Sequence, residues 1–211
     1  MYFPPERVDV HMGKHDLVCS DCHKAEDHRI LGRLLPPDRA VGTRVECTSC
    51  HDEAPHAQDR LNAHVATLAC QTCHIPMFAV ETGTKMWWDW SKAGLAGDPL
   101  DVADRLTREI QTSAAAREGM PAPVLALFDR VGTDSDVWTH YSKKKGLFLI
   151  ARRQAPEYRW YDRTTSRYLP AVVATDDAVV RINRPRGSAA DPRATIWPFK
   201  VHRGRQPYDT E

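Results

Sequence analysis

Apolar residues recur at helical spacing between residues 57 and 69. Leu61, Val65 and Leu68 lie three or four positions apart there, and His64 falls on nearly the same face. Apolar positions at this period are typical of an amphipathic helix. The pattern predicts a helix that leads directly into a cysteine-containing motif.

Later segments carry weaker patterns. A second helix is predicted over residues 102–117, where closely spaced charged side chains suggest an exposed surface insertion. The apolar run at residues 146–151 predicts a strand. Aromatic segments at residues 158–161 and 167–169 flank the polar residues 162–166, which predicts a hairpin between them.

The remaining segments predict irregular structure. Residues 1–18 are expected to be extended, and residues 30–45 to form a loop, because that stretch holds two adjacent prolines. Residues 82–90 include three tryptophans that would cover an apolar surface. The tail from Arg181 is rich in arginine, proline and glycine, and is also expected to be irregular.

Composition narrows the function classes. The net charge of the 211-residue chain is +1, so composition gives no reason to expect a nucleic-acid partner. No run of about twenty apolar residues is present, so no membrane span is predicted. The hydrophobic fraction of 42% is slightly low for a domain with a large core of its own.

All six cysteines lie in three copies of the pattern C-x-x-C-H. The residues are Cys19, Cys22 and His23, then Cys47, Cys50 and His51, then Cys70, Cys73 and His74. This pattern attaches c-type haem through two thiols about one helical turn apart, and the histidine binds the iron as the proximal ligand. The sequence therefore predicts three covalently bound c-type haems, and we expect the haem-free chain to be largely unfolded through residue 80.

Cysteine pairs at this spacing also build zinc sites and redox dithiols. Neither requires a histidine directly after the second cysteine, so its presence in all three copies favours haem. Because c-type haem is attached outside the cytoplasm, we expect a periplasmic or otherwise extracytoplasmic protein. The N-terminus lacks the order of regions found in a signal peptide, so we expect a removed signal or a piece of a longer chain.

Further histidines are candidates for the second axial position of each haem iron. They are His11, His28, His56 and His64. Histidine and methionine are the usual donors, and histidines interleaved with the motifs favour bis-histidine ligation. His28 and His56 each follow a proximal histidine by five residues, which is too short a path round a porphyrin. Each is expected to bind the iron of a neighbouring haem.

Longer stretches, several of them outside the haem motifs, occur in an order typical of one family. They are VDVHMG (8–13), EAPH to NAH (53–64), ACQTCHIP (69–76), TKMWWDW (84–90), PEYRW (156–160) and IWPFKVHRG (196–204). In these stretches the chain resembles the octahaem c-type cytochromes of the tetrathionate reductase family, except between about residues 95 and 138. The resemblance implies haems similar to the fifth to seventh of eight, with the lysine-ligated reactive haem preceding this segment.

The predicted fold class is a mainly α or irregular multihaem cytochrome c, with short helices and loops around stacked haems and a small β-hairpin in the C-terminal half. Residues 1–80 would form the three-haem segment and residues 81–211 a haem-free covering segment. The predicted function is electron transfer, with other haem segments or redox proteins as partners. The alternative is part of a reductase of tetrathionate, nitrite or hydroxylamine, whose reactive haem and oxyanion substrate belong to a full-length parent.

Overall fold

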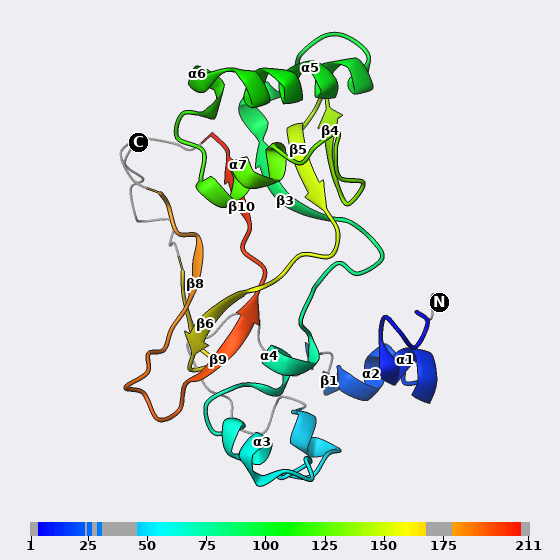
Figure 1. Ribbon diagram of the computed structural model, residues 1–211, viewed down its shortest axis with the longest axis vertical. Coiled ribbons are helices and arrows are strands. Elements are labelled where there is room, and N and C mark those ends of the chain that lie inside the picture. Colours follow the sequence, from blue (N-terminus) through cyan, green and yellow to red (C-terminus); the bar gives the residue numbers. More distant parts are fainter. Residues whose placement is uncertain (1–3, 24, 27–28, 31–45, 168–178, 208–211) are drawn as a thin grey trace. The chain divides into compact units, whose positions relative to one another are not determined.

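The chain folds into two compact units in the computed structural model, which describes residues 4–23, 25–26, 29–30, 46–167 and 179–207 (Figure 1). Met1–Pro76 and Tyr158–Phe199 form the first, named the motif unit because it holds the three C-x-x-C-H motifs. Met77–Glu157 and Lys200–Glu211 form the second, named the sheet unit. The chain therefore crosses between the units three times.

A four-stranded sheet forms the centre of the sheet unit. Its strands are β3 (Thr84–Asp89), β4 (Val137–Ser142), β5 (Gly146–Ala151) and β10 (Arg203–Arg205), in the order β10-β3-β5-β4. The pairs β3–β5 and β4–β5 are antiparallel, and β10 lies parallel to β3. Strand β10, which begins 119 positions after β3 begins, thus completes the sheet.

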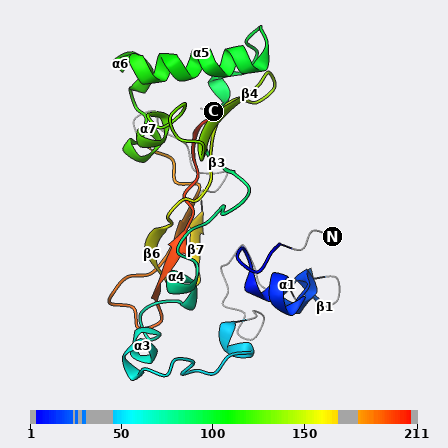
Figure 2. The same cartoon turned by 45° about the vertical axis from the view of Figure 1, so that its right-hand side comes forward.

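Helices pack on one face of this sheet. They are α5 (Pro99–Thr112), α6 (Ala114–Arg117) and α7 (Ala122–Phe128), with a 3-10 turn, η2 (Trp90–Lys92), after β3. Both ribbon views show α5 beside β4 (Figure 1, Figure 2). The Asp98 carboxylate starts α5 by accepting the Leu100 N–H at 2.8 Å, and Thr107 on α5 shares a hydrogen bond with Thr139 on β4.

Large apolar side chains fill the space between helices and sheet. Leu147, Leu149 and Phe128 are fully buried, and Trp87 meets Phe128 edge to face with ring centroids 5.4 Å apart. Asp89, a buried carboxylate at the end of β3, accepts hydrogen bonds from the backbone N–H and the hydroxyl of Ser91. The sheet unit therefore has a closely packed core made from its own side chains.

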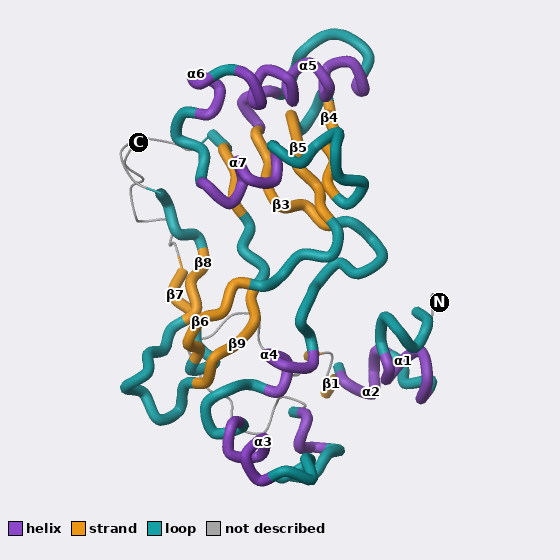
Figure 3. Tube along the Cα trace, in the orientation of Figure 1, coloured by secondary structure: helices purple, strands orange, loops and turns teal. Residues whose placement is uncertain are grey.

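The motif unit is built from short elements. Its helical turns are α1 (Val10–His15), α2 (Cys19–Cys22), η1 (Cys47–Ser49), α3 (Asp59–His64) and α4 (Cys70–His74). Its strands are β1 (Ala25–Glu26), β2 (Arg29–Ile30), β6 (Glu157–Tyr161), β7 (Thr165–Arg167), β8 (Asn183–Pro185) and β9 (Thr195–Phe199). They form three two-stranded pairs, β1-β2, β6-β9 and β7-β8, joined by long loops (Figure 3).

Few side chains of the motif unit are buried. Among its described residues, only Pro4, Ala69 and Ala194 are. Val10, Leu61 and Ile75 are at least 40% exposed although each is apolar. Burial of apolar surface is the main driving force of folding, and the described part of this unit buries little. A bound apolar group would supply the missing buried surface.

The structure corrects several expectations. Strand β6 pairs with β9, and β7 with β8, so the hairpin expected around residues 162–166 is wrong; the hairpin of the C-terminal half is β4–β5. The tail from Arg181 contributes β8, β9 and β10 and is not irregular throughout. Both differences arise because these strands pair with segments distant in the sequence, and a local sequence pattern does not indicate such pairing.

The helices also differ from expectation. The first is shorter, since α3 ends at His64. The second divides into α5 and α6, and it is no surface insertion, because Val102, Leu106 and Ile110 bury one stripe against the sheet. Helical and strand segments contribute comparably in the described residues, so a mainly α class is not supported. Most of the loop expected over residues 30–45 lies outside the described residues.

Candidate functional site

Each C-x-x-C-H motif forms one helical turn. In the first two motifs the histidine N–H donates to the carbonyl of the first cysteine, at 2.8 Å for His23 and 2.9 Å for His51. The third motif is the whole of α4. Cysteines three positions apart on one turn project from the same side, as attachment of both thiols to one porphyrin requires.

Local hydrogen bonds fix where the first two turns begin. The Asp21 carboxylate accepts the Val18 N–H at 2.7 Å, and the Ser49 hydroxyl accepts the Glu46 N–H at 3.1 Å. The turn α4 is held instead by β9, whose Ile196 carbonyl accepts both the Ala69 N–H at 3.0 Å and the Thr72 hydroxyl at 2.7 Å. The polar residues inside the motifs thus have structural roles.

Two of the candidate distal histidines lie opposite proximal ones. The rings of His11 and His51 have centroids 6.1 Å apart at an interplanar angle of 72°. The rings of His56 and His74 are also 6.1 Å apart, at 19°. Neither pair is close in sequence, so only the fold brings them together.

Asn62 holds His56 through three hydrogen bonds. Its Oδ1 accepts the His56 backbone N–H at 2.9 Å and lies 3.2 Å from Nδ1, and its Nδ2 donates to the His56 carbonyl at 2.8 Å. An amide oxygen can only accept, so in the neutral imidazole Nδ1 carries the proton and Nε2 keeps a free lone pair for a metal. Sequence reasoning missed Asn62, because no local pattern indicates a side chain that folds back six residues.

The other candidates are placed differently. His64 ends α3, is exposed, and meets no proximal ring among the described residues. His23 likewise has no ring partner in the described part of the chain, and His28 lies outside it. His11 occupies the second position of α1, whose N-terminal Asp9 accepts the Met12 N–H at 3.0 Å.

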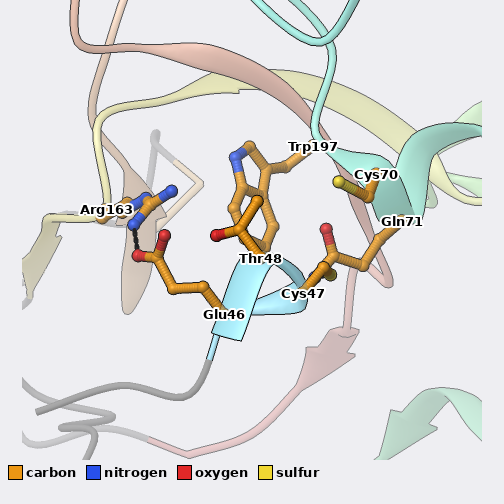
Figure 4. A pocket seen from close by; sticks show the side chains of 7 residues that line it. All are labelled: Glu46, Cys47, Thr48, Cys70, Gln71, Arg163 and Trp197. Carbon is orange, nitrogen blue, oxygen red and sulfur yellow. Dashed lines mark hydrogen bonds and ion pairs between the residues drawn. The ribbon is translucent and has the colours of Figure 1, made fainter. Parts of the chain in front are cut away.

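The second and third motifs are adjacent. Gln71 Nε2 lies 3.9 Å from Cys47 Sγ, and burial, followed by the neighbouring Cys70, raises the pKa of the Cys47 thiol. A pocket opens between them, as Figure 4 shows. It is lined by Glu46, Cys47, Thr48, Cys70, Gln71, Arg163 and Trp197.

Charged and aromatic side chains close the pocket opposite the cysteines. Arg163 forms an ion pair with Glu46, and its guanidinium carbon lies 5.9 Å from the centroid of Trp197. Trp197 and Phe199 both pack edge to face on Tyr161, at 5.7 and 5.4 Å. These contacts connect β6 and β9 to the motif pair.

The geometry of the described residues does not support a zinc site at the cysteines. Structural zinc takes four ligands, commonly cysteine and histidine. Within the described residues, no three His, Cys, Asp or Glu side chains gather as a metal ion would require. The cysteines of each motif are instead followed by a histidine whose ring, in the second and third motifs, lies 6.1 Å from that of a second histidine.

A family model described as bacterial cytochrome c matches residues 85–211. The chain belongs to the bacterial cytochrome c family. Covalently bound haem and haem-based electron transfer follow from this membership together with the motifs. No helix among the described residues of this cytochrome is long and apolar enough to cross a membrane.

A solved structure, the octahaem cytochrome c from Shewanella oneidensis, is similar to this cytochrome over 96% of its chain, with 34% identity and a TM-score of 0.71. This match confirms the resemblance to octahaem cytochromes. The cytochrome spans only 39% of that chain. A search of curated proteins found no match.

Proposed function

We propose that this cytochrome carries three c-type haems and that at least two have both axial positions filled by histidine. His51 and His11 would bind the second iron, and His74 and His56 the third. A haem with both positions filled by protein transfers electrons without binding a substrate. The chain is then an electron-transfer module.

The separation of the histidine rings is the observation that supports this proposal. A metal held at about 2.0–2.1 Å from each of two imidazole nitrogens, with each ring centroid about 1.1 Å further out, puts the centroids about 6.2–6.4 Å apart. Both observed separations are 6.1 Å. Imidazoles in direct van der Waals contact would lie closer, and unrelated surface histidines would not repeat one distance twice.

The rest of the motif unit fits a porphyrin. Val10 precedes His11 and Ile75 follows His74, and both side chains are more than 40% exposed. Porphyrin faces would cover such residues and so provide the apolar core that the unit lacks. Once bound, the haem iron supplies one-electron chemistry, while the protein sets its potential through ligands and burial.

The adjacency of the second and third motifs supports rapid transfer between their haems. Cys47 and Cys70 line one pocket, so the attached edges of the two porphyrins would be neighbours. For the first haem, His23 is the proximal ligand, and His28 and His64 are the remaining candidates for the distal one. Residues 1–80 would then supply every haem ligand and residues 81–211 would cover them, in a periplasmic or otherwise extracytoplasmic protein whose partners are further haem segments or redox proteins.

Replacement of the distal histidines tests the proposal. His15 is a matched control for His11, because both are exposed residues of α1. We expect three haems per chain by pyridine haemochrome and intact mass, and a fully low-spin oxidised spectrum for the second and third haems. His11→Ala and His56→Ala should each convert one haem to a high-spin form that binds cyanide, and His15→Ala should not. A His11→Ala spectrum identical to that of His15→Ala would contradict the proposal.

A second function is favoured by the partial coverage of the octahaem relative. Because this cytochrome spans 39% of that chain, a longer parent would have room for more haems. We propose that such a parent, of the tetrathionate reductase type, would reduce tetrathionate, nitrite or hydroxylamine at a haem outside residues 1–211. Isolated residues 1–211 should then show no reductase activity with these substrates, whereas the parent should.

A further inference from the structure

The sheet unit has two chemically different faces. Directly paired residues of neighbouring strands project to the same side, and successive residues alternate. Trp87 pairs with Leu149, and both enter the core beneath the helices. Trp88 pairs with Phe148, which pairs with His140, so these three rings lie on the opposite face.

This second face is a row of aromatic rings, and the helix-packed core does not include it. His140 stacks on Phe148 with centroids 6.2 Å apart, and His202 meets Trp88 edge to face at 6.2 Å. Gly204 lies opposite Trp88 on β10, and a Cβ atom there would come within 2.3 Å of the indole. The backbone of β10 therefore lies directly against that ring.

Two lysines lie at this aromatic face, and one of them is directly over the rings. Lys85 Nζ lies 4.2 Å from the Phe148 centroid and 5.9 Å from that of Trp88. Lys200 Nζ donates to the Thr84 hydroxyl. Together with His202 against Trp88, these lysines form what we name the cationic cluster: Lys85, Lys200 and His202.

The members of the cationic cluster repel one another. Burial, followed by the charge of Lys85, lowers the pKa of Lys200. Burial, followed by Lys200 and Lys85, lowers the pKa of His202. Each shift means that the folded protein disfavours the positive charge at that position.

Several arginines of the sheet unit are paired with carboxylates. Arg152 and Arg153 both bind Asp136, and Arg203 binds Glu157. Within the described residues, neither Lys85 nor Lys200 forms an ion pair. Lys200 is half-buried, and Lys85 and His202 are exposed. Placing these cations together without an opposite charge is unfavourable, and an anion between them would remove the cost.

We propose that the cationic cluster binds a compact anion, either an inorganic oxyanion or a carboxylate group. Lys85 and Lys200 would each donate to a different oxygen of the anion, and protonated His202 would add a third donor. Thr84 accepts from Lys200, which leaves its O–H free to donate as well. The rings of Trp88 and Phe148 form an apolar floor that limits competition from water. The inference concerns the haem-free unit and does not depend on the number of haems or on their ligands.

Thermal unfolding of the haem-loaded chain tests this site. The double variant Lys85→Gln/Lys200→Gln removes both charges, Lys85→Arg/Lys200→Arg retains them, and Lys144→Gln removes an exposed lysine from the β4–β5 turn of the same unit. Each is melted with increasing sulfate at constant ionic strength. If a free oxyanion fills the site, sulfate raises the melting temperature of the wild type and of Lys144→Gln, and its apparent affinity falls at least tenfold in the glutamine double variant.

A carboxylate from within the protein would give a different supporting result. Sulfate would then affect all variants equally, but the glutamine double variant would melt below the wild type, while the arginine variant and Lys144→Gln would not. The proposal is overturned if the glutamine double variant melts at or above the wild-type temperature with an unchanged response to sulfate. Relief of repulsion alone produces that outcome. If the double variant does not fold, the single variant Lys85→Gln replaces it in both comparisons, because Lys85 is exposed.

Discussion

Replacing Asn62 by leucine should loosen His56 while keeping the number of side-chain heavy atoms and their branching. The substitution removes an acceptor for the His56 backbone N–H and for Nδ1–H, and a donor to its carbonyl. His56 would then be free to rotate and to adopt the other tautomer, in which Nε2 is protonated and cannot bind iron.

The structure sets the size of the effect. Three hydrogen bonds at about 0.5–1.5 kcal/mol each give at most about 1.5–4.5 kcal/mol, because neighbouring contributions do not add fully. Loss of a hydrogen bond that orients a metal ligand typically costs about 10–100-fold in metal affinity. That factor equals about 1.4–2.8 kcal/mol and overlaps the lower half of the first range. We therefore expect His56 ligation of the third haem to weaken by 10–100-fold.

Spectra of the oxidised Asn62→Leu protein measure this change. One haem should become partly high-spin and should bind cyanide at concentrations that leave the wild type unaffected. Asn62→Asp is the comparison variant, since its carboxylate still accepts both N–H groups and only the donor to the His56 carbonyl is lost. It should stay low-spin, with a lower potential because the anionic acceptor makes the imidazole more basic. If Asn62→Leu has the wild-type spectrum, cyanide affinity and potential, the role assigned to Asn62 is wrong.

Three further outcomes are expected. Gly146→Ala should abolish cooperative folding of the sheet unit in thermal melts, because φ is +78° and the new Cβ would lie 1.9 Å from the Asp89 carbonyl oxygen. Gly132→Ala is the control. Its φ is also positive but no atom lies within 4 Å of the new Cβ, so it should lower the melting temperature far less. Arg153 and Arg152 lower the pKa of Asp136 in the folded state, so its stabilising effect is present above the ordinary aspartate pKa of about 3.9 and is lost as pH falls through the lowered value. The difference in melting temperature between wild type and Asp136→Asn should therefore be largest near pH 7 and vanish in acid. In haem-free protein, amide hydrogens through residue 80 should exchange without protection, whereas those of the β3–β5 pair should be protected. A cooperative melt of residues 1–80 without haem would contradict the idea that porphyrins form the core of that segment.

Chemistry that depends on local spacing was predictable from the sequence. The cysteines and the histidine of each haem-attachment motif lie within five consecutive residues, so the motifs could be located without a fold. Strand β5, whose apolar run is buried on both faces, and most of α5 were also predictable from local sequence patterns. His11 and His56 were among the candidate ligands because of their residue type alone.

Pairings between distant residues were decided only by the tertiary structure. It brought His11 to His51 and His56 to His74, placed Asn62 on His56, and joined β6 to β9 and β10 to β3. Each of these contacts depends on loop paths and on packing energies summed over many residues, and no single segment encodes them. The sequence by itself therefore determined that this protein is a c-type cytochrome, and only the fold decided which histidine rings lie beside each other and which cations meet on the aromatic face of the sheet.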